Sequence, residues 1–188
     1  VFALWADLDG TLFAGTSPNG RIYRIAAGAA EVYFEPKETY VWALARGADG
    51  ALWAATGTEG RLHRISAKGE GEVAFDSEET HLRSLLPLAG GDLLVGSASS
   101  GLVLRWRARD RTVRTVYDSA LGEVVALAVQ SSVAPDHSAT LYVSAIDLAA
   151  ITNATFAVQA PLALLLGVAL LVSTLLALLS LRRAVTRP

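Results

Sequence analysis

A unit of about 40 residues recurs along most of the chain, and this repeat constrains the fold more than any other feature. Each copy has an apolar segment, a small Asp-Gly or Gly-Gly turn, a second apolar segment and then a Gly-led segment. The copies cover residues 1–40, 41–81 and 82–123, and a partial copy covers 124–145. A period near 40 residues with four short strands in each unit is typical of the blades of a β-propeller.

The first copy shows how each unit is expected to divide into strands. Residues 1–6 and 11–16 are short apolar runs joined by Asp9-Gly10, a pair that strongly favours a hairpin turn. Residues 21–25 alternate polar and apolar side chains, as expected of a strand with one wet face. We therefore predict an all-β fold of four-stranded antiparallel blades.

The fourth copy is incomplete, so about three and a half blades can be recognised in the sequence. Its first hairpin is stretched by residues 130–138, its second strand is expected over 141–145, and the pattern then stops. About three and a half blades do not close a ring, because propellers have about four to eight. An open array would leave unpaired strand edges, which favour aggregation. We expect further sequence, or another chain, to complete the ring.

A polar loop precedes each new copy and is the candidate ligand or partner loop. Glu38-Thr39 occupies it before the second copy and Glu79-Thr80 before the third, while Glu123 stands where Tyr40 and His81 stand. In a propeller this loop leads back to the strand beside the central channel. The side chains of Glu38, Thr39, Glu79 and Thr80 either cap the loop's own backbone groups or face a ligand. We favour capping, since turn backbone groups need partners.

The repeat resembles the propeller repeats of the NHL, YVTN and two-component-regulator kind. The residues that carry this resemblance are the Asp-Gly-x-Leu-aromatic segments at 9–13 and 49–53, and the Gly-Arg-(Ile/Leu)-x-Arg-Ile segments at 20–25 and 60–65. The resemblance extends over residues 1 to about 145 and implies a propeller fold. Such repeats occur in binding scaffolds and in a few metal-dependent lactonases and lyases, so the resemblance does not indicate which of these functions the protein has.

The C-terminal part of the chain has a different character. Residues 162–181 carry no charge, and 11 of these 20 residues are leucine. A helix of that length is about 30 Å long, which matches the hydrocarbon core of a bilayer. We predict a transmembrane helix over 161–183, with a linker over 146–160 before it and a short tail over 184–188 after it.

The flanks of this segment predict its orientation and its contacts. Arg182 and Arg183 follow the span directly and would anchor it at the membrane interface. Because basic residues are retained in the cytoplasm, we expect the tail inside and the blades on the periplasmic or extracellular side. Small residues four apart let a second helix approach closely. The candidate packing residues are Ala163, Gly167, Ala169, Ser173 and Ala177.

One segment has the form of a catalytic motif. The run from Asp7 to Thr11 is similar to the first motif of the haloacid-dehalogenase phosphatases, in which an Asp nucleophile works beside a magnesium ion. Asp9, however, lies in the hairpin turn of the repeat, and Asp7 corresponds to Gly47 in the next copy. That family also needs a lysine on an α/β scaffold. We interpret the motif as a repeat turn and assign no catalytic residue.

Composition argues against several other classes of function. The formal net charge is −2 and no basic run is present, which disfavours nucleic-acid binding. The chain has no cysteine, and His63, His81 and His137 lie in no ligand spacing, so we predict no metal site and no cofactor. Lactonase propellers bind a metal with Glu, Asn and Asp at the channel mouth. Glu38 and Glu79 are the residues here that could take such a part.

The sequence therefore predicts a membrane-anchored, non-catalytic β-propeller. We expect a binding, scaffold or accessory subunit of a larger membrane complex, whose partners are other membrane-protein subunits and the lipid bilayer. A broad rigid face of loops suits this role, and a membrane anchor raises the local concentration of that face at its partner. The alternative from another class is a metal-dependent lactonase or lyase. A ligand-sensing ectodomain is a third hypothesis, although the tail is too short for a signalling domain.

Overall fold

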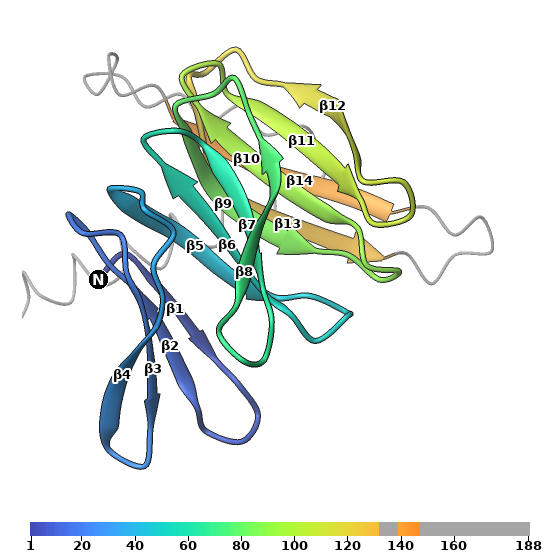
Figure 1. The fold of residues 1–188 in the computed structure, drawn as a ribbon. Coiled ribbons are helices and arrows are strands. Elements are labelled where there is room, and N and C mark those ends of the chain that lie inside the picture. The colour runs from blue at the N-terminus through green and yellow to red at the C-terminus, as the bar shows by residue number, and fades with distance from the viewer. Residues whose placement is uncertain (132–138, 147–188) are drawn as a thin grey trace, which may run out of the picture. The chain divides into compact units, whose positions relative to one another are not determined.

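Each complete copy of the repeat forms four antiparallel strands that neighbour one another in chain order (Figure 1). The computed structural model describes residues 1–131 and 139–146. Blade 1 consists of β1 (Ala3–Ala6), β2 (Leu12–Gly15), β3 (Ile22–Ala26) and β4 (Ala29–Phe34). Blade 2 consists of β5 (Tyr40–Arg46), β6 (Leu52–Gly57), β7 (Arg61–Ile65) and β8 (Gly71–Asp76). Blade 3 consists of β9 (His81–Pro87), β10 (Leu93–Ala98), β11 (Leu102–Arg107) and β12 (Thr112–Asp118).

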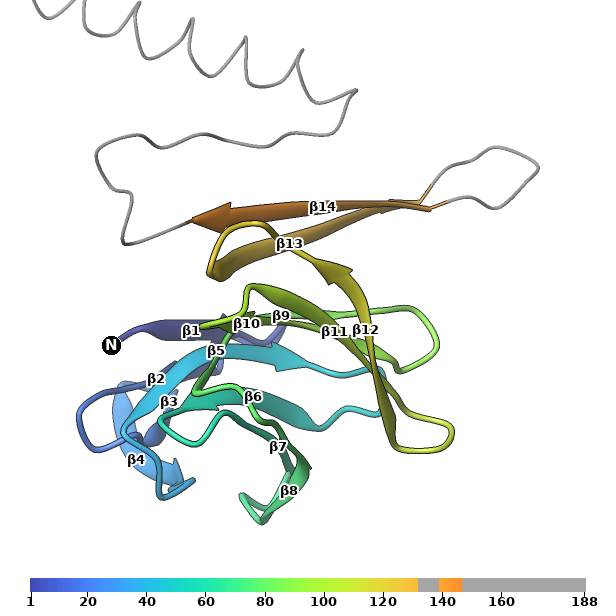
Figure 2. The ribbon, with the colours of Figure 1, turned by 90° about the horizontal axis from the view of Figure 1, so that it is seen from above.

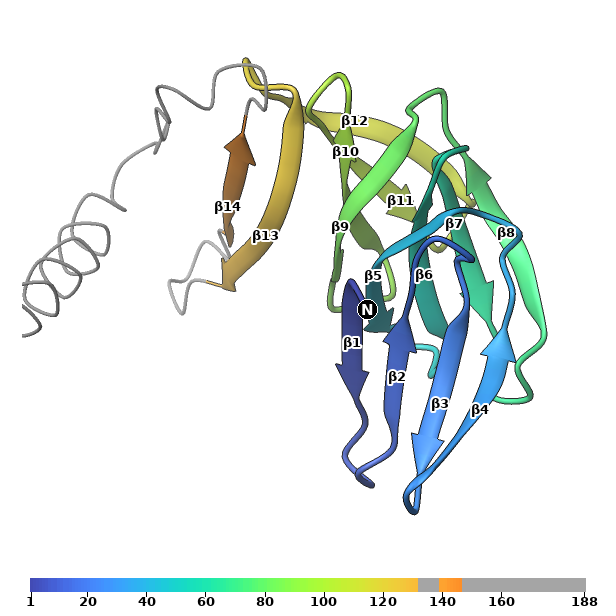
Figure 3. The same ribbon diagram turned by 90° about the vertical axis from the view of Figure 1, so that its left-hand side faces the viewer.

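The fourth copy contributes a hairpin to the described part of the chain. Its strands are β13 (Glu123–Ser131) and β14 (Ala139–Ile146), which pair antiparallel. Single bridges connect successive blades, from Gly57 to His81 and from Ala98 to Glu123. Both bridges join the second strand of one blade to the first strand of the next. These bridges join blade 2, blade 3 and the hairpin into one hydrogen-bonded sheet. Blade 1 is a separate sheet, and Figure 3 shows its four strands side by side.

The predicted Asp-Gly pairs form the first turn of blades 1 and 2. A carboxylate oxygen of Asp9 accepts a hydrogen bond from the Thr11 backbone N–H at 2.9 Å, and Asp49 accepts one from Ala51 at 3.1 Å. The following residue, Gly10, has a φ of 86°, a left-handed conformation that costs glycine little. The same short sequence therefore sets the same turn in both copies.

Buried apolar side chains lie between the blades and hold them face to face. Ile22, Leu62 and Val103 occupy one position of the repeat, on the third strand, and all are 0 % exposed. Val41, Leu82 and Val124 occupy another, on the first strand of the following blade, and are equally buried. One cluster unites Ile22 with Val41, a second unites Leu62 with Leu82, and a third unites Val103 with Val124. Repetition of these two positions thus builds the same interface three times.

Small residues on the second strand allow this close stacking. A Cβ atom on Gly15 would lie 2.5 Å from Cγ1 of Val41, and one on Gly96 would lie 2.6 Å from Cγ1 of Val124. Both distances are far below an ordinary van der Waals contact. The equivalent residue of blade 2, Ala55, is also small and fully buried. The packing of one blade on the next therefore requires a minimal side chain at this position.

The first strands of successive blades contact one another, β1 with β5, β5 with β9 and β9 with β13. The later strands of each blade lead away from this row, and β4, β8 and β12 are the outermost (Figure 2). This is the arrangement of a propeller, in which first strands face the axis. We call β1, β5, β9 and β13 the inner strands.

The predicted membrane segment is not part of the described structure. No helix with the length and hydropathy to cross a bilayer occurs within residues 1–131 and 139–146. The predicted span over 161–183 lies outside these ranges, as do its small packing residues, the anchors Arg182 and Arg183, and the tail. These assignments remain predictions.

Candidate functional site

Aromatic, cationic and acidic side chains gather at one end of the inner strands. They occupy two positions of the repeat. Tyr40, His81 and Glu123 are the first residues of β5, β9 and β13 and are equivalent to one another. Phe2, Trp42 and Arg83 share a second position, two residues further along. Because β9 contacts both β5 and β13, the repeat brings these side chains together. We call the six residues the inner-strand cluster.

The aromatic part of the inner-strand cluster is a continuous set of ring contacts. Tyr40 and Trp42 stack nearly parallel, with ring centroids 4.6 Å apart. Phe2 meets the Trp42 ring edge-on at 5.0 Å and remains 57 % exposed. His81 lies edge-on to Trp42 at 5.6 Å, and its Nδ1 accepts a hydrogen bond from the Trp42 indole N–H at 3.3 Å. Rings from three inner-strand segments thus form one surface.

Arg83 connects this aromatic surface to an acidic residue. Its guanidinium lies 4.0 Å from the centroid of the Trp42 ring, a cation–π arrangement. Its Nε is 3.3 Å from a carboxylate oxygen of Glu123, and the two side chains are 23 % and 18 % exposed. Partial burial reduces solvent screening of such a pair. The guanidinium therefore lies over the indole of one neighbouring strand and forms an ion pair with the glutamate of the other.

His81 is held in its neutral form by this environment. Burial lowers the pKa of His81, and the positive charge of Arg83 lowers it further, against the opposing effect of Glu123. A neutral ring is also what the hydrogen bond from Trp42 requires, because only an unprotonated Nδ1 accepts. His81 therefore contributes an aromatic edge and an acceptor to the cluster.

The predicted loop residues make bonds between blades. A carboxylate oxygen of Glu38 accepts a hydrogen bond from the Glu59 N–H at 3.0 Å, and Glu79 accepts one from the Ser100 N–H at 3.1 Å. Each glutamate thereby caps a turn of the following blade, and the Glu38 side chain is 0 % exposed. Thr39 is partly buried, whereas Thr80 is exposed. The four residues therefore lie at the same end as the inner-strand cluster, next to Tyr40 and His81 in sequence.

The motif that is similar to a phosphatase lies in a hairpin. A carboxylate oxygen of Asp9 accepts a hydrogen bond within its own turn. Asp7 forms an ion pair with Arg46 and accepts a hydrogen bond from the Trp5 indole N–H. The hydrogen bond from Arg46 lowers the pKa of Asp7, and burial opposes it. A carboxylate engaged in this way links the first turn of blade 1 to β5 of blade 2.

The two histidines in the described part of the chain, His63 and His81, have different surroundings. His63 is buried between blades 1 and 2 beside Phe34, His81 belongs to the inner-strand cluster, and His137 lies outside the described residues. Within the described part of the chain, no group of three or more His, Cys, Asp or Glu side chains has an arrangement suited to a metal ion.

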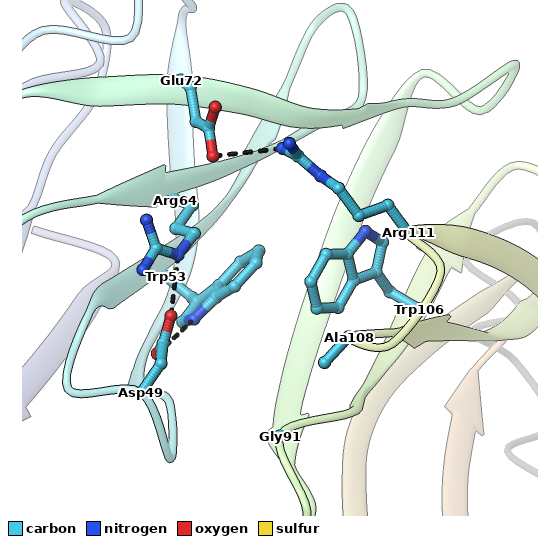
Figure 4. A pocket seen from close by; sticks show the side chains of 8 residues that line it. All are labelled: Asp49, Trp53, Arg64, Glu72, Gly91, Trp106, Ala108 and Arg111. Atoms are coloured by element: carbon cyan, nitrogen blue, oxygen red, sulfur yellow. Dashed lines mark hydrogen bonds and ion pairs between the residues drawn. The ribbon is translucent and has the colours of Figure 1, made fainter.

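A second feature, a cavity of about 390 Å³, opens between blades 2 and 3 (Figure 4). Two ion pairs lie on its rim: Arg64 Nε to Asp49 Oδ2 at 2.7 Å, and Arg111 Nη2 to Glu72 Oε1 at 3.1 Å. Burial disfavours the ionised form of Asp49 and so tends to raise its pKa. Hydrogen bonds from the Arg64 side chain and the Ala51 N–H have the larger combined effect, and the pKa of Asp49 is lowered. The lining residues are Asp49, Trp53, Arg64, Glu72, Gly91, Trp106, Ala108 and Arg111.

The sequence could have revealed more of these sites than it did. Tyr40, His81 and Glu123 share one position of the repeat, at the start of an inner strand, and this alignment is a signal that polar and aromatic side chains gather there. The cavity gives a weaker signal, because it depends on which side chains fill the space between two particular blades.

No family model and no curated protein matches the chain, whereas solved structures do. Virginiamycin B lyase from Staphylococcus aureus matches with a TM-score of 0.58 at 14 % identity, over 79 % of this chain and 52 % of the lyase. A gluconolactonase from Xanthomonas campestris matches with a TM-score of 0.58 at 19 % identity, over 77 % of this chain and 53 % of that one. The extracellular domain of a hybrid two-component system from B. thetaiotaomicron matches with a TM-score of 0.58 at 18 % identity, over 81 % of this chain and 22 % of that one.

These neighbours are β-propeller proteins, and they support the predicted fold. The described part of the chain is all-β, with antiparallel sheets that stack as propeller blades. The chain spans about half the length of the lyase and of the gluconolactonase. At such low identity the likeness extends to the fold and not to the activity.

Proposed function

We propose that the protein is a membrane-anchored, non-catalytic β-propeller that serves as a binding or accessory subunit of a membrane complex. The inner-strand cluster is the surface through which it would engage a partner. The predicted helix over 161–183 would hold it in the bilayer, with the blades on the periplasmic or extracellular side and the C-terminus in the cytoplasm.

The observation that carries this proposal is the composition and exposure of the inner-strand cluster. Aromatic residues and arginine provide most of the energy at protein interfaces, because they bury a large area and lose little side-chain freedom. Tyr40 and Trp42 are stacked and partly exposed, and Arg83 is fixed against Trp42. A surface ordered in advance in this way reduces the entropic cost of association.

The proposal is also supported by what the charged groups near the cluster already do. Glu38 and Glu79 bind backbone N–H groups of the following blade, and Glu123 binds Arg83. Carboxylates used in this way contribute to the framework of the surface. A metal-dependent lactonase or lyase would need such groups free to bind a cation.

The test is purification of the full chain in mild detergent from its native membrane, followed by mass spectrometry of the proteins that accompany it. We expect defined membrane subunits to co-purify, and the substitution Trp42→Ala to reduce their recovery at least tenfold. The matched control is Trp5→Ala, which removes an indole that binds Asp7 outside the cluster.

Two results would contradict the proposal. One is a chain that purifies alone and hydrolyses a lactone, with a cation bound near Glu38 and Glu79; this would favour the enzymatic alternative. The other is equal recovery of partners with wild-type chain and the Trp42→Ala variant, which would place the binding surface elsewhere.

A further inference from the structure

The interface between blades 1 and 2 shows how this repeat places a cation beside the loop that ends a blade. Arg61 is the first residue of β7, and its Nη1 lies 3.6 Å from Oε1 of Glu38 in the loop after blade 1. The same guanidinium has its Nε 3.3 Å from Oδ2 of Asp76. The second oxygen of Glu38, Oε2, accepts the hydrogen bond from the Glu59 N–H. One oxygen of Glu38 therefore binds the backbone, and the other faces a positive charge.

The next interface repeats the glutamate but not the arginine. Glu79 is equivalent to Glu38, and its Oε2 accepts a hydrogen bond from the Ser100 N–H in the same way. Leu102, however, stands at the position of Arg61. Among the described residues, Glu79 forms no ion pair with a basic side chain. Glu79 thus keeps the backbone bond and lacks the positive charge that Glu38 has.

A cavity of about 360 Å³ lies at this place, between the loop after β8 and the strands β11 and β12. Both Glu79 and Leu102 line it, so it lies where the preceding interface has the Arg61 side chain. Its walls are open to a ligand, because Glu78 is exposed and Phe75 and Leu102 are partly exposed.

The charge of this cavity is strongly negative. Its lining, all of it within the described residues, carries no lysine or arginine but three carboxylates, those of Asp76, Glu78 and Glu79. Only Asp76 is partly neutralised, by Arg61 from outside the lining. In the loop after blade 1 the residue equivalent to Glu78 is Lys37, so the change of one residue reverses a charge. A concave surface with one sign of charge attracts ligands of the other sign.

The apolar wall of the cavity defines the rest of the ligand. Phe75, Leu102 and Val113 line the cavity and pack against the buried core between blades 2 and 3. The described carboxylates form no group of three suited to a metal ion. An organic cation on an apolar stem fits better, since its stem leaves water while its charge stays beside the acids. A guanidinium also offers several N–H donors in one plane, which suits carboxylate oxygens.

We propose that this cavity binds a guanidinium group on a short alkyl stem, supplied either by a small molecule or by an arginine side chain of a peptide. The guanidinium pairs with Glu79 and Glu78, as Arg61 lies beside Glu38, and the stem packs against Phe75 and Leu102. The volume of about 360 Å³ is within the range of small-ligand sites. The proposal does not rest on the inner-strand cluster or on the partner that it binds.

The test is a titration of the full ¹⁵N-labelled chain in non-ionic detergent, followed through the backbone N–H signals of Glu78 and Leu102. One arm uses n-butylguanidine and the other the blocked tripeptide acetyl-Gly-Arg-Gly-amide. The matched probe is n-butylurea, which has nearly the same shape and no charge. We expect a saturable shift with n-butylguanidine and binding at least tenfold weaker with n-butylurea. Binding of the tripeptide as well would identify a peptide as a source of the cation, and its failure would limit the site to small molecules.

Substitutions connect these signals to the cavity. Glu79→Gln removes the charge but keeps an oxygen for the Ser100 N–H, and it should weaken n-butylguanidine binding at least fivefold. The control Glu70→Gln, on the exposed turn between β7 and β8, should leave the affinity within twofold. Leu102→Arg reproduces blade 2 and should weaken binding at least tenfold, because its own guanidinium would occupy the site.

Three results would overturn the proposal. They are the absence of a saturable shift with n-butylguanidine, equal affinities for n-butylguanidine and n-butylurea, and equal affinities of the Glu79→Gln and Glu70→Gln chains. Should Leu102→Arg fail to fold, the comparison of the two glutamine variants decides.

Discussion

His63 should make the stability of the blades depend on pH in a window where few other groups titrate. Its side chain is buried between blades 1 and 2, and the residue is 3 % exposed. Burial lowers the pKa of His63 from 6.5 to about 4, and the nearby charge of Arg61 adds to this effect. In the unfolded chain the ring would take up a proton near pH 6.5, whereas in the folded chain it stays neutral down to about pH 4.

The sign and size of the effect follow from this difference. Stability rises with pH wherever the unfolded state binds more protons, so the contribution is complete above pH 6.5 and is lost as the pH falls toward 4. At 1.36 kcal/mol for each pH unit, the loss between pH 7 and pH 5 is about 2 kcal/mol. The carboxylates with lowered pKa values, such as Asp7 and Asp92, act mainly below this window.

The assay is urea unfolding of the full chain in mild detergent at pH 7, 6 and 5. The comparison variant is His63→Leu, because Leu104 occupies the same repeat position in blade 3 and is buried there. We expect the wild type to lose about 2 kcal/mol more than the variant between pH 7 and pH 5. His81, whose pKa is also lowered, is present in both chains and cancels in the difference. Equal losses in the two chains would refute the reasoning.

Three further substitutions test the packing of the blades, each by the urea midpoint of the full chain. Gly96→Ala places a Cβ 2.6 Å from Val124 and should lower the free energy of unfolding by about 1–3 kcal/mol. The control Gly122→Ala, whose Cβ would have its nearest atom at 3.6 Å, should lower it by less than about 1 kcal/mol. Similar costs for the two substitutions would argue against the close approach of the blades at Gly96. Tyr33→Phe removes the hydrogen bond to Ser66 and should cost about 1 kcal/mol, and no change would mean that this bond is not formed. Glu38→Ala leaves the Glu59 N–H without its partner and should lower the free energy of unfolding by about 1–3 kcal/mol. The control Glu78→Ala, on the exposed loop, should change it by less than about 0.5 kcal/mol. Equal effects of the two substitutions would contradict the capping role of Glu38.

Much of the fold could be predicted from the sequence because it depends on local patterns. The Asp-Gly turn needs only Asp9 and Gly10 and forms as expected. The Gly-led segment forms the third strand, β3 (Ile22–Ala26), as expected, and its first residue, Ile22, is buried. A two-residue period and a turn that tolerates positive φ both act over a few residues, which is why they can be read from one chain.

The sites depended on relations between copies and were harder to predict. The contact of Trp42 with Arg83 joins two blades, and it requires knowing that their inner strands lie side by side. The cavity is lined by side chains of two blades, such as Asp49 and Arg111, and their proximity is visible only in space. The predicted loop residues Glu38 and Glu79 were located next to the cluster, yet their side chains reach the following blade.

The central claim is that successive blades stack through the third strand of one blade and the first strand of the next, which brings the inner strands together. Nuclear Overhauser spectroscopy of the methyl-labelled full chain tests this most directly. We expect cross-peaks between Ile22 and Val41, between Leu62 and Leu82, and between Val103 and Val124, because each pair shares one buried cluster. Absence of all three, in a sample whose hairpins show the cross-strand peaks expected within each blade, would contradict the account.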